Sequence, residues 1–112
     1  MTESDVPRPP LDEDPTMTAN ALKAMAHPLR WKILCTLGDR ELSVGEIVEQ
    51  TGTSQSNISQ HLEQLRNKNI VTSRKEANRI YYRIRNGKLL ELVGTMRSVL
   101  CPANLDDRYP GN

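Results

Sequence analysis

The sequence predicts a mainly α-helical domain that carries one β-hairpin, in the order helix, helix, helix-turn-helix, hairpin, helix. Apolar residues recur every three or four positions in four segments, as they do along the buried face of a helix, and a fifth segment is rich in helix formers. Gly52 divides the stretch from Ser43 to Leu65 into two short helices. Two β-prone runs then flank a short turn that contains Asn78. A helix-turn-helix followed directly by a hairpin predicts a winged helix-turn-helix fold.

The first two predicted helices have clear start and stop signals. Residues 17–26 are rich in helix formers and follow Asp14-Pro15-Thr16, which can cap them. Pro28 suits the first turn of the second helix, and Gly38 follows its last turn. Between them an apolar residue recurs every four positions: Leu29, Ile33 and Leu37. We expect this stripe to face the core.

The helix-turn-helix stretch carries cap signals around both of its helices. Ser43 and Glu46 stand three residues apart, which is the spacing of a capping box. Gly52 can adopt the left-handed conformation that ends a helix, and Thr53 or Ser54 can cap the next one. In that second helix the apolar residues fall on one side and are expected to pack inward: Ile58, Leu62 and Leu65.

The opposite side of this second helix is polar and almost free of acid. At about 100° per residue, the outward positions are Ser56, Ser59, Gln60 and Glu63, with Gln55 and His61 beside them. Serine and glutamine both donate and accept hydrogen bonds, which suits base edges and phosphates. A helix that enters a DNA groove presents such a face. A merely solvated helix presents it too, so the pattern alone leaves both interpretations open.

The segment after this helix predicts a hairpin. The β-prone runs cover residues 70–75 and 79–85, with Asn78 in the turn. In the second run, one face carries Ile80, Tyr82 and Ile84, and the other carries Arg79, Tyr81, Arg83 and Arg85. A hairpin placed directly after a recognition helix is a wing, and its basic face lies beside the helix-turn-helix.

Positive charge is concentrated around the second helix and the hairpin. The whole chain is nearly neutral, with a net charge of +1. Residues 54–88 hold eight Lys and Arg against two acids, a net charge of +6, whereas residues 1–16 have a net charge of −4. A local basic surface on a neutral chain is what phosphate binding requires. The predicted partner is therefore double-stranded DNA.

The length of 112 residues allows one domain. We expect residues 1–14 to form an acidic, proline-rich tail, residues 15–101 the winged helix-turn-helix domain, and residues 102–112 a second tail. No apolar run approaches the about 20 residues of a membrane span. The N-terminus is acidic, unlike a secretion signal. The sequence thus predicts a cytoplasmic protein without a membrane partner.

The last predicted helix, from Asn86 or Gly87 to about Leu100, has a long apolar stripe. Part of this stripe can cover the core of the domain itself. The favoured interpretation is a homodimer interface that also includes the first helix, formed by Leu22, Leu89, Leu92, Val93, Met96 and Val99. A dimer would hold two recognition helices about 34 Å apart, one turn of DNA, and would bind an inverted-repeat operator.

Several blocks of residues together resemble the ArsR/SmtB family of winged-helix repressors. The blocks are residues 22–30 with Ile33-Leu34, residues 53–62, and Tyr81-Tyr82-Arg83, and the resemblance covers about residues 17–100. The resemblance implies a transcriptional repressor whose DNA-facing residues are Gln55, Ser56, Ser59, Gln60 and His61, with Arg74, Lys75 and Arg79 in the wing. It also implies a structural role for His27.

Metal-sensing members of this family offer a comparison for the effector. Arsenic- and cadmium-sensing members often carry Cys-Val-Cys before the recognition helix, where this chain has Ser43-Val44-Gly45. Zinc-sensing members carry Asp-x-His and His-x-x-Glu in the last helix, which here has Glu91 as its only acid and no histidine. The two Cys and two His form no compact set of the about four ligands that Zn²⁺ prefers. We therefore predict no metal and no cofactor, with a metal(loid)-responsive repressor as the alternative.

The two cysteines carry the remaining signal. Cys35 lies in the second helix, and Cys101 ends the last one before Pro102. A reactive pair in a cytoplasmic protein favours redox sensing over a structural disulfide. This placement resembles the dithiol branch of the family, the BigR/SqrR-like persulfide sensors. The resemblance implies that a disulfide or short sulfur chain joins the cysteines and releases the operator, with reactive sulfur species as inducer. Peroxide as inducer and a pair of inert thiols stay open as alternatives.

Two other functional classes fit the sequence less well. A protein-interaction module on the same scaffold would tolerate acid on the outer helix face and the wing, which here carry little. Catalysis would need paired carboxylates, a phosphate-binding glycine loop, or a Ser or Cys beside a base, and the sequence shows none of these arrangements. The sequence therefore predicts a DNA-binding regulator with no catalytic residues.

Overall fold

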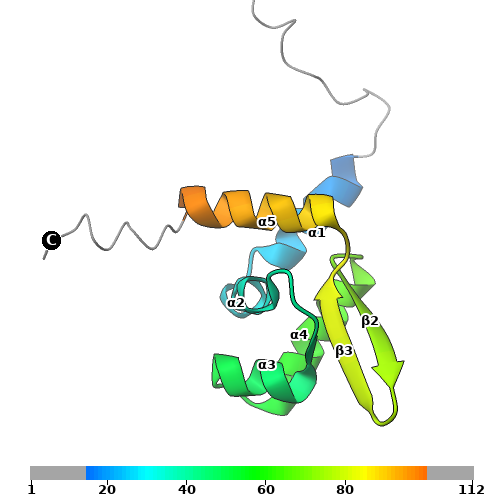
Figure 1. The fold of residues 1–112 in the computed structure, drawn as a ribbon. Helices are drawn as coiled ribbons and strands as arrows, with labels where there is room; N and C mark the ends of the chain where they lie inside the picture. Colours follow the sequence, from blue (N-terminus) through cyan, green and yellow to red (C-terminus); the bar gives the residue numbers. More distant parts are fainter. Residues whose placement is uncertain (1–14, 101–112) are drawn as a thin grey trace, which may run out of the picture.

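A computed structural model describes residues 15–100, and Figure 1 shows the helices packed together with a β-hairpin at one edge. The elements, in chain order, are α1 (Pro15–Met25), α2 (Pro28–Leu37), β1 (Leu42–Ser43), α3 (Val44–Thr51), α4 (Gln55–Asn67), β2 (Val71–Glu76), β3 (Arg79–Ile84) and α5 (Gly87–Leu100). This order confirms the predicted winged helix-turn-helix fold and adds the short strand β1. The predicted tails, residues 1–14 and 102–112, lie outside the described residues, as does Cys101.

The predicted cap residues fix the ends of the helix-turn-helix. The Ser43 hydroxyl accepts from the Glu46 backbone N–H at 3.2 Å, and the Glu46 carboxylate accepts from the Ser43 backbone N–H at 2.8 Å. This reciprocal pair is a capping box at the start of α3. Gly52 ends α3 with a φ of 76°, and Ser54 caps α4. Helix α1 begins earlier than predicted, at Pro15, because proline fits the first turn of a helix.

The strands form an antiparallel sheet in the order β1-β3-β2. Strand β1 joins β3 through Leu42 opposite Tyr82. Strands β2 and β3 pair along their whole length and leave Ala77 and Asn78 as the turn. Ala77 has a φ of 57°, in the left-handed region that favours glycine. Strand β1 could not be predicted from the sequence, because two residues are too few to show an alternating pattern.

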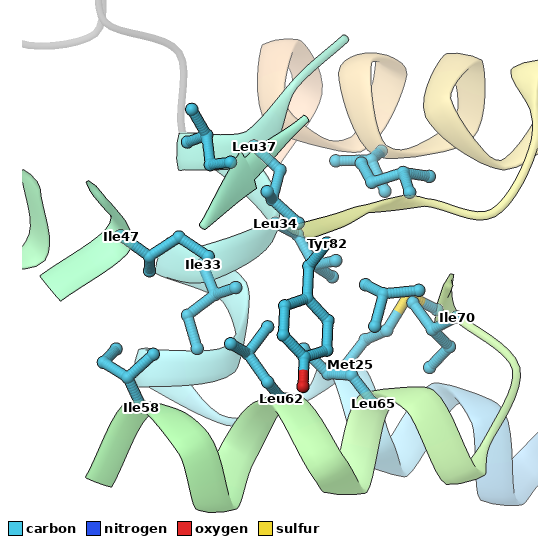
Figure 2. Packing of buried hydrophobic residues seen from close by; sticks show 14 of the residues in the cluster. Met25, Ile33, Leu34, Leu37, Ile47, Ile58, Leu62, Leu65, Ile70 and Tyr82 are labelled. Carbon is cyan, nitrogen blue, oxygen red and sulfur yellow. The ribbon is translucent and has the colours of Figure 1, made fainter. Parts of the chain in front are cut away.

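The core lies between α2, α3, α4 and the sheet. Its fully buried side chains are Ile33, Leu34, Leu37, Ile47, Ile58, Leu62, Leu65 and Val71. Figure 2 shows Ile58, Leu62 and Leu65 of α4 pointing into this cluster, with the ring of Tyr82 extending toward the same helix. Burying each large apolar side chain stabilises the fold by about 1.5–3 kcal/mol. The predicted inward face of α4 is confirmed, and it fixes the rotation of the helix about its axis.

Helices α1 and α5 lie at the end of the domain opposite α3 and the hairpin tip (Figure 1). Val93 is 3% exposed and packs in the core of its own chain, so it adds almost no surface to the predicted dimer interface. Leu89 and Met96 are half-buried and pack against the same core. The other predicted interface residues are exposed: Leu22 by 52%, Leu92 by 46% and Val99 by 68%. One edge of the apolar stripe on α5 therefore packs in the core, and the other edge is exposed to solvent.

Candidate nucleic-acid interface

The outward face of α4 presents polar side chains from a firmly held helix. Gln55, Ser56, Ser59 and Gln60 are all exposed. The helix begins at a cap in which the Ser54 hydroxyl accepts from the backbone N–H of the third helical residue at 3.2 Å. Because the opposite face is buried in the core, these four side chains point into solvent together. Their groups can both donate and accept hydrogen bonds, as base edges require.

An open groove of about 740 Å³ runs between α3, the start of α4 and the hairpin. Gln55 and Ser59 line it from α4, and Arg79 lines it from β3. The fold thus brings together predicted DNA-facing residues from two separate elements. Lys75 is exposed on β2 and does not line this groove. A phosphate backbone in the groove would meet the recognition helix on one side and the Arg79 guanidinium on the other.

Two carboxylates of α3, Glu46 and Glu49, line the same groove. The net charge of +6 was counted over residues 54–88. It did not include these two acids, because α3 precedes that range in the chain. Hydrogen bonds from Ser43, with the backbone N–H first, lower the pKa of the Glu46 carboxyl, so this acid stays charged within its cap. The two carboxylates repel phosphate along α3 and so favour the α4 and hairpin sides of the groove for DNA.

His61 does not share the outward orientation of its neighbours on α4. It is half-buried, and its Nδ1 accepts a hydrogen bond of 3.0 Å from Arg30 Nε of α2. Burial first, and then the charges of His27 and Arg30, lower the pKa of His61. His27 is the N-cap residue of α2, which confirms its predicted structural role. The predicted DNA-facing set therefore includes one residue, His61, that the structure places in a contact between helices.

Arg74 of β2 is engaged within the protein. It donates to Glu41 at 2.8 Å and to Glu76 at 2.6 Å, and its guanidinium lies 4.9 Å from the centre of the Tyr81 ring. Tyr81 is its partner across the hairpin, and Glu41 directly precedes β1. Arg74 therefore reaches over β3 and ties β2 to the far side of the sheet. Nothing in the local sequence signals this contact, since the two partners Arg74 and Glu41 are 33 residues apart.

A second groove, of about 420 Å³, lies between α1, α2 and the end of α5. Its lining is almost wholly apolar: Leu22, Met25, Ala26, His27, Pro28, Trp31, Met96 and Leu100. Cys35 is half-buried on α2, one turn beyond Trp31. Leu100 ends α5 and directly precedes Cys101 in the chain. The structure thus brings α2 and the last turn of α5 to one groove, while the Cys101 thiol itself lies outside the described residues.

The described histidines are not grouped with cysteines or acids. Within residues 15–100, no three His, Cys, Asp or Glu side chains are grouped as metal ligands would be. His27 and His61 instead pack against each other, with ring centroids 4.5 Å apart. None of the helices in this part of the chain combines the length and hydropathy that crossing a bilayer requires.

Comparison with known proteins adds the family. Residues 27–73 match the family described as "Bacterial regulatory protein, arsR family". The chain is 36% identical over 104 residues to the biofilm growth-associated repressor of Xylella fastidiosa, a match that covers 90% of this chain and 91% of that protein. It is 42% identical over 83 residues to the transcriptional activator HlyU of Vibrio cholerae, with 74% and 77% covered.

A solved structure supports the same grouping. The structure described as reduced HlyU from Vibrio cholerae N16961 aligns with a TM-score of 0.71 and 38% sequence identity, and the match covers 78% of this chain and 92% of that one. Similarity of this extent in both sequence and fold shows family membership and not fold alone. The chain therefore belongs to the arsR family of bacterial regulatory proteins, which regulate transcription by binding DNA and are not enzymes.

Proposed function

We propose that this protein is a dimeric repressor that leaves an inverted-repeat operator when Cys35 and Cys101 are cross-linked by reactive sulfur species or oxidation. The observation that carries the proposal is the position of Cys35 on α2, the helix that packs against both α4 and α5. A bond from this thiol to the residue after α5 would join the helix that supports the DNA-reading element to the outermost helix of the domain. Repression is the activity named for the Xylella relative.

DNA recognition is assigned to the exposed face of α4 and to the hairpin. Gln55, Ser56, Ser59 and Gln60 would bind base edges and nearby phosphates in the major groove. Arg79 and Lys75 would bind phosphates, which position the protein without reading sequence. The identity of the operator is set by side chains of α4, so Gln60→Ala should change base preference more than total affinity. Binding-site selection with both proteins measures that change.

Dimerisation is assigned to the exposed apolar side chains of α1 and α5. Leu22, Leu92 and Val99 are not buried in the core of the single chain, and each is more than 40% exposed. Such a surface is stabilised when another copy covers it. Two chains related by a twofold axis would present two α4 helices about 34 Å apart, which matches half-sites one DNA turn apart.

The proposed cross-link is a balanced sulfur-transfer reaction. A persulfide, R–S–SH, passes its outer sulfur to one cysteine thiolate and leaves as the thiol R–SH. The second cysteine then attacks the inner sulfur of the new persulfide, and H₂S departs as the disulfide closes. If both cysteines have first gained a sulfur, closure leaves a trisulfide and again releases H₂S. With peroxide, the two thiols are oxidised to a disulfide and peroxide is reduced to water.

A tether between α2 and α5 would alter the spacing of the recognition helices. A disulfide needs Cα atoms within about 7 Å, and added sulfur atoms extend that reach. Because α5 carries the proposed dimer surface and α2 supports α4, the bond would shift the subunit contact relative to the DNA-reading face. Half-sites at fixed spacing then fit poorly, and affinity falls. One solved relative is described as reduced HlyU, so a redox state is specified for at least one member of this group.

Mass spectrometry after treatment with glutathione persulfide, beside a peroxide-treated sample, tests the chemistry. We expect a cross-linked species that lacks two hydrogens or carries an added sulfur between Cys35 and Cys101, together with loss of operator binding. Dithiothreitol should restore both the mass and the binding.

Cys35→Ser and Cys101→Ser are the matched variants for the same test. Each should bind the operator as the parent does and should ignore the persulfide. A single-cysteine variant that still leaves DNA on treatment would contradict the sensor proposal. Release of both variants by a metal(loid) salt would instead favour the metal-responsive alternative.

A further inference from the structure

The two histidines of the chain meet where the α1–α2 junction touches the recognition helix. His27 is the N-cap residue of α2, and His61 lies on α4. Their ring centroids are 4.5 Å apart, and the ring planes are tilted by 40°. This contact belongs neither to the exposed polar face of α4 nor to the thiol chemistry proposed above.

Each ring uses its Nδ1 atom as a hydrogen-bond acceptor. His61 Nδ1 accepts from Arg30 Nε at 3.0 Å, and His27 Nδ1 accepts from the Leu29 backbone N–H at 3.1 Å. Neither donor gives up its proton near neutral pH, since arginine stays charged and a backbone amide does not ionise. The Nδ1 atom of His61 is therefore unprotonated in this arrangement, and the His61 ring is neutral.

Arg30 extends the contact to a third helix. Its guanidinium also donates to the Ala24 carbonyl oxygen at 3.3 Å, near the end of α1. One side chain thus joins α1, α2 and α4. His27 lies at the edge of the apolar groove between α1, α2 and α5. The cluster of His27, Arg30 and His61 therefore connects the α1–α5 end of the domain with the helix that reads DNA.

We infer that His61 is a positioning residue that holds α4 in its orientation for DNA, and that DNA binding requires its ring to be neutral. The inference rests on DNA binding by α4 and is independent of the cysteine chemistry. Protonation puts a hydrogen on Nδ1, which then faces the Arg30 Nε–H as a second donor. The hydrogen bond is lost and two positive charges come together. Acidification therefore releases α4 from the α1–α2 junction.

The surroundings of His61 favour the neutral ring. Among the described residues, burial lowers the pKa of His61 first, followed by the charges of His27 and Arg30. Asn57 and Leu65, one turn away on α4, are uncharged. A pKa that is lower in the folded protein means that stability is complete above the ordinary histidine pKa of about 6.5 and falls as pH drops below it. DNA binding that needs the neutral ring weakens in the same direction.

The test measures affinity for a duplex that the protein has selected from a random library, at about pH 7.5 and about pH 5.5. Every variant carries Cys35→Ser, so that the proposed thiol chemistry cannot contribute. The parent should lose up to about tenfold in affinity per subunit at the lower pH, because one required deprotonation costs a factor of ten per pH unit. His61→Gln should match the parent at the higher pH and keep its affinity at the lower one, since its amide oxygen accepts from Arg30 and does not ionise.

Two further variants separate positioning from other roles. His27→Asn keeps a side-chain acceptor for the α2 cap and leaves His61 as the only histidine, so it should retain the pH response. His61→Ala removes the acceptor and should bind about five- to tenfold more weakly at both pH values. Far-ultraviolet circular dichroism should give the same helix content for all variants at both pH values.

A direct contact between His61 and DNA predicts the opposite sign, because a charged histidine beside phosphate strengthens binding in acid. Unchanged or stronger binding by the parent at low pH therefore overturns the inference. A pH response that survives in His61→Gln overturns it as well. Loss of helix content in acid would also overturn it, because the effect would then belong to folding of the whole domain.

Discussion

The α4–hairpin end and the α1–α5 end of the domain present opposite kinds of surface. At the first end, polar and basic side chains cover an apolar layer in which Leu62 and Leu65 are 0% exposed. At the second, apolar side chains are themselves uncovered, with Leu92 at 46% and Leu100 at 69%. One chain completes the first surface, which is ready to meet a polyanion. The second surface is incomplete until another apolar surface covers it.

This difference separates the tasks of the two ends. In the proposed function, the α4–hairpin end reads DNA, and the α1–α5 end sets how two such surfaces are spaced. Helix α2 packs against elements of both ends, and it carries Cys35 and Arg30. A chemical change on α2 can therefore affect the reading surface without touching DNA, which is what a regulated repressor requires.

The largest effect is expected when the apolar end is made polar. Leu92→Glu places a charge among exposed apolar side chains of α5 and should convert the dimer to a monomer. Loss of the second half-site contact should then weaken operator binding by about a hundredfold or more, because the linked second contact is lost. Sedimentation velocity gives the oligomeric state, and fluorescence anisotropy gives the affinity.

Ser98→Glu is the matched control for that substitution. Ser98 is exposed on α5 and lies about 120° around the helix from Leu92. It should leave both the dimer and the affinity unchanged. Equal binding by Leu92→Glu and the parent would show that the apolar end has no part in DNA binding.

An intermediate effect is expected at the reading end. Arg79→Ala removes the hairpin cation that lines the groove beside Gln55 and Ser59. Affinity should fall about five- to tenfold across all sequences, and the salt dependence should lose about one phosphate contact per subunit. Titrations at several salt concentrations measure the slope. A slope equal to that of the parent would remove the hairpin from the DNA contacts.

Arg74→Ala sharpens the distinction between binding and positioning within the hairpin. The Arg74 guanidinium is occupied by Glu41 and Glu76, so its loss should weaken DNA binding only about two- to threefold. The salt slope should stay that of the parent, unlike the slope of Arg79→Ala. If Arg74→Ala lowers the salt slope as much as Arg79→Ala does, the result would show that Arg74 of the parent leaves its carboxylate partners and binds phosphate in the complex.

The smallest effect is expected at the hairpin turn. Ala77 has a φ of 57°, which glycine adopts at little cost. Ala77→Gly should stabilise the domain by about 0.5–1 kcal/mol and change DNA affinity by less than about twofold. Asn78→Gly is the matched control, since Asn78 is not among the described residues with positive φ, and it should destabilise by a similar amount. Urea denaturation measures both, and stabilisation by Asn78→Gly alone would contradict the turn geometry.

Features with a local chemical signal could be predicted from the sequence. The capping box at Ser43, the left-handed Gly52 and the cap at Ser54 depend on neighbours within a few residues, and all three are present. The two hairpin strands follow from β-prone runs within one segment, so their observed bounds differ from the predicted ones by a single residue at most ends. The inward face of α4 follows from helical spacing in the same way.

Features that depend on distant parts of the chain could not be predicted in this way. Arg30 and His61 are 31 residues apart, so no local spacing shows that they form a hydrogen bond. The pairing of Arg74 with Glu41 is hidden for the same reason. Val93 belongs to an apolar stripe whether it faces the core or a partner, and only the packing of α5 decides between the two. Residues of the candidate site were therefore easier to identify than their roles.

Sedimentation equilibrium of the protein with a duplex selected from a random library shows how many chains bind each DNA molecule. We expect two chains on each duplex, an inverted repeat in the selected sequence, and affinity that falls steeply as salt is raised. One chain per duplex, or binding without preference among sequences, would rule out a DNA-reading surface formed by two chains.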